Sequence, residues 1–160
     1  FDERMAAPAP RIVIEAADPG DPDTSYMIGA THALATNARQ RRTADRHGAG
    51  DLPSPSAQDA AGFCDHVYAA FETGQRPPFF AYREPSRGPI DSGWRIGCLD
   101  PEHRHDGDSL RIAPLARAAI LPGLVDYFAL PPGWVVTWED DAFWTSAPGL
   151  SESHRDSDGD

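Results

Sequence analysis

The stretch of residues 79–144 limits the possible folds of this 160-residue chain more than any other part of it. At its centre the segment 91–93, Asp-Ser-Gly, passes directly into the segment 94–96, Trp-Arg-Ile. Polar turn formers followed at once by an aromatic and an apolar residue mark the passage from an exposed loop to a buried strand. We therefore expect a strand over residues 94–99, with Trp94 as an anchor of the core.

Short apolar runs separated by proline and glycine continue on both sides of this strand. They predict further strands over residues 79–82, 110–112, 134–138 and 143–144, and short helices over residues 115–121 and 124–130. Strands and helices segregated in this way are typical of an α+β fold. We expect a small antiparallel or mixed sheet from the second half of the chain, packed against one or two helices from the first half.

The first half of the chain is expected to supply the main helices. Apolar residues recur at helical spacing over residues 60–71, which predicts a helix with Ser56 as its N-cap and Gly74 as its C-cap. A second helix is expected over residues 23–46.

Composition divides the chain into three parts. Residues 1–22 are expected to form a flexible arm with one short strand at 11–15, residues 23–147 a single α+β domain, and residues 148–160 a disordered acidic tail. The sequence has no signal-peptide pattern and no run of about eighteen apolar residues, so neither secretion nor a membrane span is expected. The resulting expectation is a cytoplasmic protein.

The chain carries a formal net charge of −11 at pH 7. A field of this sign repels nucleic-acid phosphates and anionic lipid, and it attracts cationic partners. We therefore expect no binding of nucleic acid or of a membrane. A basic protein is the better candidate for a partner.

Cysteine and histidine are the residues most able to bind a metal ion here. Cys98 is followed by His103 and His105, and a His-x-His pair can supply two ligands of a tetrahedral zinc site. No second ligand pair stands at a recognisable spacing, so we interpret this segment as a hydrated loop and His66 as a surface or boundary histidine. Cys64 and Cys98 are expected to be buried free thiols. A zinc enzyme or sensor that uses the His103/His105 loop is the alternative hypothesis.

No catalytic signature is present in the sequence. The nucleophile pattern Gly-x-Ser-x-Gly and the glycine-rich patterns that hold phosphates are both missing. Asp91 and Ser92 suit the shaping of a turn, in which a side-chain oxygen accepts a hydrogen bond from a following backbone N–H. We therefore expect a protein that is not an enzyme and that uses no cofactor.

Acidic residues adjoin aromatic ones at the last predicted hairpin. Alternation places the side chains of Trp134, Val136 and Trp138 on one face of the strand at residues 134–138. The candidate partner-binding acids are Glu139, Asp140 and Asp141 in the turn that follows, and Asp106 and Asp108 in the earlier loop. Aromatic and acidic side chains together suit a binder of a basic protein, and a plain hairpin turn is the alternative interpretation.

Several segments within residues 79–144, taken together, resemble a known family. They are Phe-Ala-Tyr-Arg-Glu-Pro at 80–85, Asp-Ser-Gly-Trp-Arg at 91–95, Leu-Arg-Ile-Ala-Pro-Leu at 110–115 and Trp-Val-Val-Thr-Trp at 134–138. This combination is similar to the Imm33 (DUF2185-like) immunity-protein family of bacterial polymorphic toxin systems. The most specific motif residues are Tyr82, Arg83, Glu84, Asp91, Ser92, Gly93, Trp94 and Arg95.

The resemblance implies a small α+β protein that is encoded beside a toxin and protects the producing bacterium by binding that toxin. Together with the acidic charge, it predicts an immunity protein that neutralises a cognate, basic protein toxin by stoichiometric protein–protein interaction. The motif residues are expected to shape a turn and anchor the core rather than to contact the toxin. A generic regulatory interaction domain is a further alternative.

Overall fold

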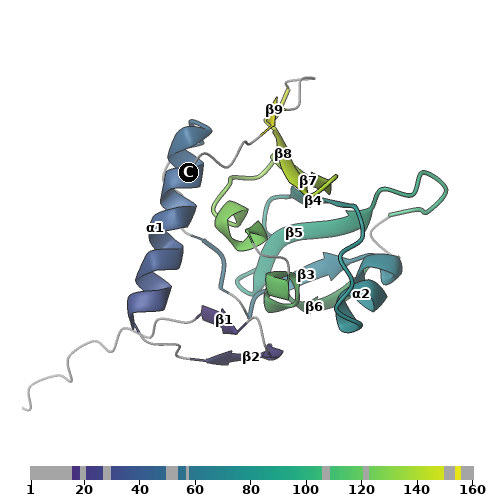
Figure 1. Ribbon diagram of the computed structural model, residues 1–160, viewed down its shortest axis with the longest axis horizontal. Helices are drawn as coiled ribbons and strands as arrows, with labels where there is room; N and C mark the ends of the chain where they lie inside the picture. Colours follow the sequence, from purple (N-terminus) through teal and green to yellow (C-terminus); the bar gives the residue numbers. More distant parts are fainter. Residues whose placement is uncertain are drawn as a thin grey trace, which may run out of the picture.

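One mixed sheet of seven strands organises the described part of the chain (Figure 1). The computed structural model describes residues 16–18, 21–26, 30–49, 54–56, 58–105, 109–120, 123–149 and 154–155. The strands of the sheet are β3 (Ala60–Phe63), β4 (Phe79–Arg83), β5 (Asp91–Cys98), β6 (Arg111–Pro114), β7 (Val135–Glu139), β8 (Ala142–Ser146) and β9 (His154–Arg155). Their order is β6-β3-β5-β4-β7-β8-β9, with β3 and β5 parallel and the other neighbours antiparallel. The expected α+β fold is confirmed.

Strand β5 is the most deeply buried strand of the sheet. All of its residues from 92 to 98 are buried, and Trp94 and Ile96 are fully so. β5 lies between β3 and β4, and the helix α2 (Asp65–Glu72) packs against it. The indole Nε1 of Trp94 donates a hydrogen bond to the carbonyl of Phe128 at 3.3 Å. The expected strand and the expected core position of Trp94 are both confirmed.

A longer helix and two short 3-10 helices complete the architecture. They are α1 (Ala30–Arg46), η1 (Leu115–Ile120) and η2 (Leu124–Tyr127). In Figure 1, α1 stands beside the sheet and packs against η2. Gln40 Nε2 donates to the carbonyl of Val125 at 2.9 Å, and Arg39 pairs with Asp126 at 2.9 Å. The helices predicted over residues 115–121 and 124–130 are present, but they are shorter and of the 3-10 type.

The helix predicted over residues 60–71 is wrong in its first half. Residues 60–63 form β3, which pairs with β5 on one side and with β6 on the other. A Cβ at Gly62 would lie 2.9 Å from Arg95 Cδ, so this strand depends on a residue without a side chain at that position. The helix begins only at Asp65. Phe63 on β3 and Val67 and Phe71 on α2 enter the same core, which explains why their spacing imitates one continuous helix.

The end of α2 agrees with the prediction. The N–H of Gly74 donates to the Phe71 carbonyl and that of Gln75 to the Ala70 carbonyl, which is the Schellman pattern. Gly74 has a φ of 73°, which glycine adopts without strain. Gly74 therefore ends the helix as expected.

The start predicted for the first helix is also wrong. Residues 21–26 form strand β2 (Asp21–Tyr26), which pairs antiparallel with β1 (Ala16–Asp18) in a separate two-stranded sheet. Tyr26 is a residue type that favours strands, and it pairs with Ala16 of β1. The helix α1 begins at Ala30. The strand predicted at residues 11–15 lies outside the described residues.

The last hairpin agrees with the sequence analysis. β7 and β8 are joined by Asp140 and Asp141, whose φ values of 53° and 57° are typical of a type I′ turn. Trp134 and Val136 are buried, and Trp138 packs against the same core. β9 pairs with β8 beyond the hairpin, and the other residues after Gly149 lie outside the described part. Among the described helices, none combines the length and the apolar character needed to cross a membrane.

Candidate metal centre

The two cysteines lie side by side at the carboxyl ends of two parallel strands. Cys64 directly follows β3, and Cys98 is the last residue of β5. The N–H of Cys64 donates to the Ile96 carbonyl at 2.8 Å, and the N–H of Cys98 donates to Cys64 Sγ at 3.3 Å. Both thiols are free and buried, as the sequence predicted. The pairing of β3 with β5 therefore brings the two sulfur atoms together.

Cys64 is also the N-cap of α2. Its extended backbone, with φ −68° and ψ 151°, lets Sγ accept a hydrogen bond from the N–H of Val67 at 3.5 Å. Burial raises the pKa of the Cys64 thiol, and the N–H groups of Val67 and Cys98 oppose that rise. Donors of this kind stabilise a thiolate, which is the form of cysteine that binds metals.

Two histidines return to the thiols from the loop after β5. Asp100 starts this loop as a turn, because its side chain accepts the N–H of Glu102 at 2.9 Å and its carbonyl accepts the N–H of His103 at 3.2 Å. His103 Nδ1 then lies 3.2 Å from Cys98 Sγ, and His105 Nε2 lies 3.4 Å from the same sulfur. The donor atoms of Cys64, Cys98, His103 and His105 all lie within 4.8 Å of one another. We refer to these four residues as the Cys/His cluster.

The spacing of the Cys/His cluster suits a tetrahedral zinc ion. Zinc binds sulfur at about 2.3 Å and imidazole nitrogen at about 2.0 to 2.1 Å, so a sulfur and a nitrogen on one ion lie about 3.6 Å apart. The contacts of Cys98 Sγ with His103 and His105, at 3.2 and 3.4 Å, are close to that separation. Two thiolates and two imidazoles are also the donor set of many structural zinc sites. These four residues could therefore hold one zinc ion.

Aromatic rings fix the orientation of both histidines. His66 stacks on His103 with ring centroids 3.9 Å apart, and His103 meets His105 edge-on at 4.9 Å. Phe80 of β4 contacts the other side of His105 at 5.2 Å. A Cβ at position 97 would lie 2.6 Å from Phe80 Cζ and 2.9 Å from His105 Cδ2. Gly97 therefore makes room for the rings beside Cys98.

The neighbouring imidazoles favour the neutral form of His105. Burial lowers the pKa of His105, and the nearby His103 and His66 lower it further, against an opposing effect of Asp100. Neutral imidazole is the form that binds a metal ion. The lowered pKa of His105 thus agrees with its position as a candidate metal ligand in the Cys/His cluster.

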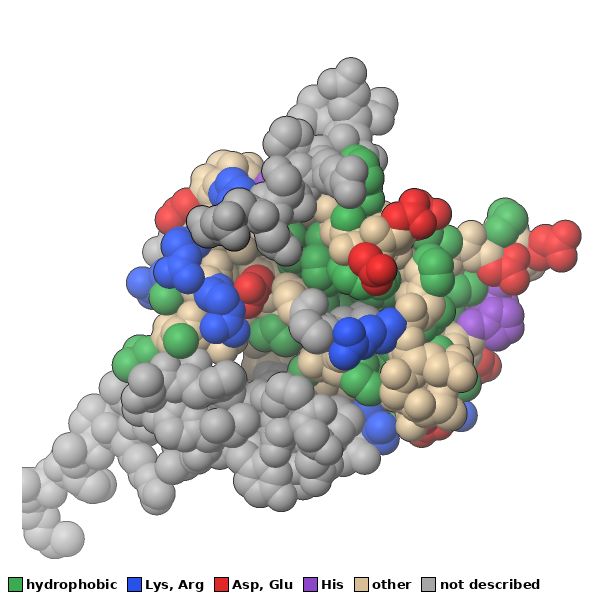
Figure 2. Space-filling model, in the orientation of Figure 1, with side chains coloured by type: hydrophobic (Ala, Val, Ile, Leu, Met, Phe, Trp, Pro, Cys, Tyr) green, Lys and Arg blue, Asp and Glu red, His purple; other side chains and the backbone are tan. Residues whose placement is uncertain are grey.

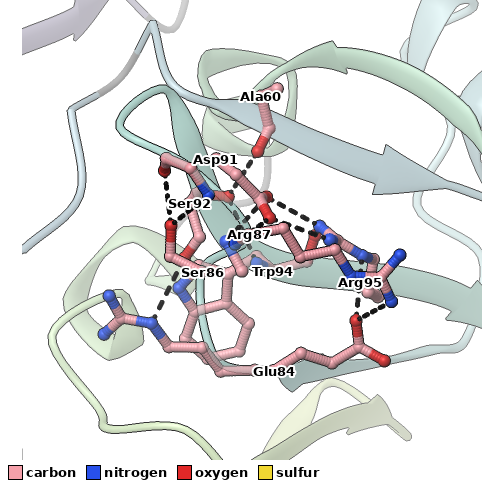
Figure 3. A network of polar contacts seen from close by, with 11 residues as sticks. Ala60, Glu84, Ser86, Arg87, Asp91, Ser92, Trp94 and Arg95 are labelled. Carbon is pink, nitrogen blue, oxygen red and sulfur yellow. Dashed lines mark hydrogen bonds and ion pairs between the residues drawn. The ribbon is translucent and has the colours of Figure 1, made fainter.

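The motif residues around Asp91 form a separate polar network (Figure 3). The carboxylate of Asp91 accepts the N–H groups of Arg87 and Gly93 at 2.9 and 3.0 Å, and two bonds from the Arg95 guanidinium at 3.1 and 3.2 Å. Glu84 lies on the other side of Arg95, at 3.5 Å. Burial would raise the pKa of Asp91, but these bonds, led by that of Arg95, lower it to about 2. Asp91 is therefore a turn-shaping anion, as the sequence suggested.

The other motif residues join this loop to the core. Ser92 Oγ donates to the Ala60 carbonyl at 2.8 Å and accepts the N–H of Trp94 at 3.2 Å. Arg83 donates to the carbonyls of Leu130 at 2.6 Å and Phe128 at 3.3 Å, and burial lowers its pKa. The carbonyl of Gly93, a residue with φ of 77°, accepts a hydrogen bond from the N–H of Glu84 at 2.8 Å. Tyr82 is half-buried and stacked on Phe80. The motif residues thus join β4 and β5 to Ala60 of β3 and to residues 128–130, through hydrogen bonds to backbone carbonyls.

The candidate partner-binding acids divide into two groups. Glu139, Asp140 and Asp141 are exposed at the end of the β7–β8 hairpin. Asp106 and Asp108 lie outside the described residues. Figure 2 shows acidic side chains near the end of this hairpin and several positively charged ones over α1, with others elsewhere on this face.

Comparisons with protein-family models, with curated proteins and with solved structures find no match to the chain. Sequence reasoning connected Cys98 with His103 and His105 but missed Cys64, because it was assigned to the interior of a helix. His66 is on a helix and exposed, as expected, but its contact with His103 was not foreseen. The available signal was a Cys-x-His pair at 64–66 that precedes the Cys-x-x-x-x-His-x-His group at 98–105. Only the pairing of β3 with β5 shows that these two groups meet.

Proposed function

We propose that this chain is a zinc-binding protein in which Cys64, Cys98, His103 and His105 hold one structural zinc ion. The observation that supports this most is the mutual approach of four donor atoms to within 4.8 Å of one another. They come from the β3–α2 junction, the end of β5 and the following loop, which the metal would tie together. Four protein ligands complete a tetrahedral zinc site, whereas catalytic sites keep one position open. The four-residue donor set therefore favours a structural role of the metal over a catalytic one.

Metal analysis of protein purified without chelator tests the zinc site. We expect about one equivalent of zinc, and a cobalt-substituted protein with the visible absorption of tetrahedral thiolate coordination. Cys98→Ser and His103→Asn are expected to lose most of the zinc. Glu102→Gln is the matched control, since Glu102 is exposed in the same loop and is not a member of the cluster. Fewer than about half an equivalent of zinc in the parent protein, even after zinc is added, would refute the site.

A second proposal concerns the partner that such a binding domain would recognise. We propose that the chain is an Imm33-like immunity protein that acts in the cytoplasm and neutralises a cognate toxin by tight stoichiometric binding. Two observations support it: the motif residues form one connected network, and Glu139, Asp140 and Asp141 present three exposed carboxylates at the β7–β8 turn. With a net charge of −11, a basic toxin is the partner with the complementary field, and nucleic acid and membranes are not.

Coexpression with a toxin encoded next to this gene tests the second proposal. We expect a stable complex, and loss of protection when the gene is removed. The variant Asp140→Asn/Asp141→Asn should weaken the complex, because Asn tolerates positive φ and only the charge is lost. Asp65→Asn removes a different carboxylate, 71% exposed, and should leave binding unchanged. Equal survival of toxin-expressing cells with and without this protein would refute the proposal.

A further inference from the structure

His66 is a fifth imidazole or thiol group beside the four members of the Cys/His cluster. Its ring is nearly parallel to that of His103, with centroids 3.9 Å apart and an interplanar angle of 19°. Its Nδ1 lies 3.8 Å from Cys98 Sγ. The set of donor atoms that lie within 4.8 Å of one another does not include His66. The side chain therefore adjoins the cluster without completing it.

The Cys/His cluster is buried on its cysteine side and closer to solvent on its histidine side. Cys64 and Cys98 are buried at the start of α2 and the end of β5, and Phe80 of β4 contacts His105. His103 and His105 are only half-buried, so their side of the cluster is the one nearest solvent. His66 is itself exposed and lies over His103 on this side.

We propose that His66 is a positioning residue that shields the zinc site, and that it slows release of the metal without being one of its ligands. This inference rests on the zinc site proposed above. The ring of His66 presents its face to His103, which holds the ligand imidazole in place and occupies space that an attacking chelator needs. Substitution of residues that orient metal ligands typically costs about 10- to 100-fold in metal affinity or activity. His66 lies on α2 two residues after Cys64, the N-cap of that helix, so the same helix start positions both residues.

The rate at which zinc passes from the loaded protein to an excess of a coloured chelator tests this proposal. For His66→Ala we expect release about tenfold faster than in the parent, with one zinc still bound at the start. His66→Phe keeps a flat ring on His103 and should restore the slow rate of the parent. Glu72→Ala, at an exposed position of the same helix, should not alter the rate.

Each other result would overturn the shielding role. Equal rates for the parent and His66→Ala would show that the ring does not protect the metal. A fast His66→Phe protein would show that a nitrogen of His66 matters rather than its ring face, and a loss of bound zinc in His66→Ala would make His66 a ligand. These outcomes differ from failure of the zinc site itself, in which the parent protein would bind no zinc and there would be no release to measure.

Discussion

Gly97 leaves room for the two rings that support the Cys/His cluster. Any side chain at this position would meet Phe80 Cζ at 2.6 Å and His105 Cδ2 at 2.9 Å. Real Cβ atoms do not approach other atoms so closely, so Phe80 or His105 would have to move. His105 Nε2 lies 3.4 Å from Cys98 Sγ, and a shift of its ring would remove it from the cluster.

We therefore expect Gly97→Ala to weaken zinc binding by about tenfold or more, in line with other substitutions next to metal ligands. Competition with a zinc buffer measures the affinity. Gly88→Ala is the matched control, because a Cβ at Gly88 meets nothing within 4 Å. Equal zinc affinities of the two variants would contradict the role assigned to Gly97.

Asp91 makes stability depend on pH in a defined range. The pKa of Asp91 is about 2 in the folded protein, compared with 3.8 for an aspartate without these partners. Its side chain is 16% exposed. A folded-state pKa below the unfolded one means that the carboxylate stabilises the fold above pH 3.8, and that this contribution disappears as pH falls toward 2. The difference corresponds to about 2 kcal/mol.

The variant Asp91→Asn should lack this pH-dependent contribution to stability, because the amide does not titrate. We expect the free energy of unfolding of the parent to exceed that of Asp91→Asn by about 2 kcal/mol more at pH 5 than at pH 2. Urea unfolding at both pH values measures the difference. Other acids and the Cys/His cluster titrate in both proteins and cancel. The buried Arg95 keeps Glu84 as its remaining carboxylate neighbour, and its loss of the Asp91 charge adds a cost that does not vary between these pH values. A constant difference would contradict the lowered pKa.

At the scale of whole elements, residues 60–71 show where apolar spacing alone fails to predict secondary structure. Most strands of the second half were predicted because proline and glycine separate short apolar runs there. Runs of this length are typical of strands and too short for most helices. Within residues 60–71 the one glycine, Gly62, stands inside an apolar run and does not separate two runs. Phe63, Val67 and Phe71 face one core from two different elements, and helical spacing alone cannot distinguish this from a single helix. The strand depends on partners that are distant in sequence, β5 and β6.

The Cys/His cluster was only half predictable for the same reason. Cys98, His103 and His105 are close in sequence, so a turn after β5 was enough to suggest that they meet. Cys64 is 34 residues away from Cys98 and joins them through the parallel pairing of β3 with β5. A pairing of this kind leaves no local mark in the sequence. The motif residues, in contrast, were correctly expected to shape a turn, because their Asp-Ser-Gly segment acts through neighbouring backbone groups.

The elements joined by the metal should loosen together when it is removed. Zinc would connect the start of α2, the end of β5 and the loop over residues 99–105. We expect hydrogen exchange to accelerate at backbone amides of residues 64–68 and 99–105 when the protein is treated with a chelator, while amides of the β7–β8 hairpin exchange as before. Mass spectrometry of peptic fragments measures this. In Cys98→Ser the chelator should change nothing, and a uniform acceleration over the whole parent chain would contradict a local role.

Across the whole molecule, Trp94 connects the sheet to the helical side. Its side chain is fully buried, its ring lies 5.8 Å from that of Phe128, and its Nε1 donates to the Phe128 carbonyl. We expect Trp94→Ala to lower the free energy of unfolding by about 3 to 5 kcal/mol, and Trp138→Ala, at a half-buried position, to lower it less. Urea denaturation measures both. A Trp94→Ala protein that unfolds like the parent but fails to bind its partner would assign Trp94 to the interface instead.

Global stability should also follow the concentration of free zinc. A ligand that binds only the folded chain stabilises it by about 1.4 kcal/mol for every tenfold rise in its free concentration above the dissociation constant. In a domain of this size, 1 kcal/mol raises Tm by about 2 to 4 °C, so we expect about 3 to 6 °C per tenfold change in free zinc. Calorimetry in a series of zinc buffers measures the slope. Cys64→Ser should melt at one temperature throughout the series, because the cluster then lacks the sulfur that links β3 and α2 to the metal. A parent protein with an equally flat response would mean that folding and metal binding are independent, and the zinc would then have no structural role.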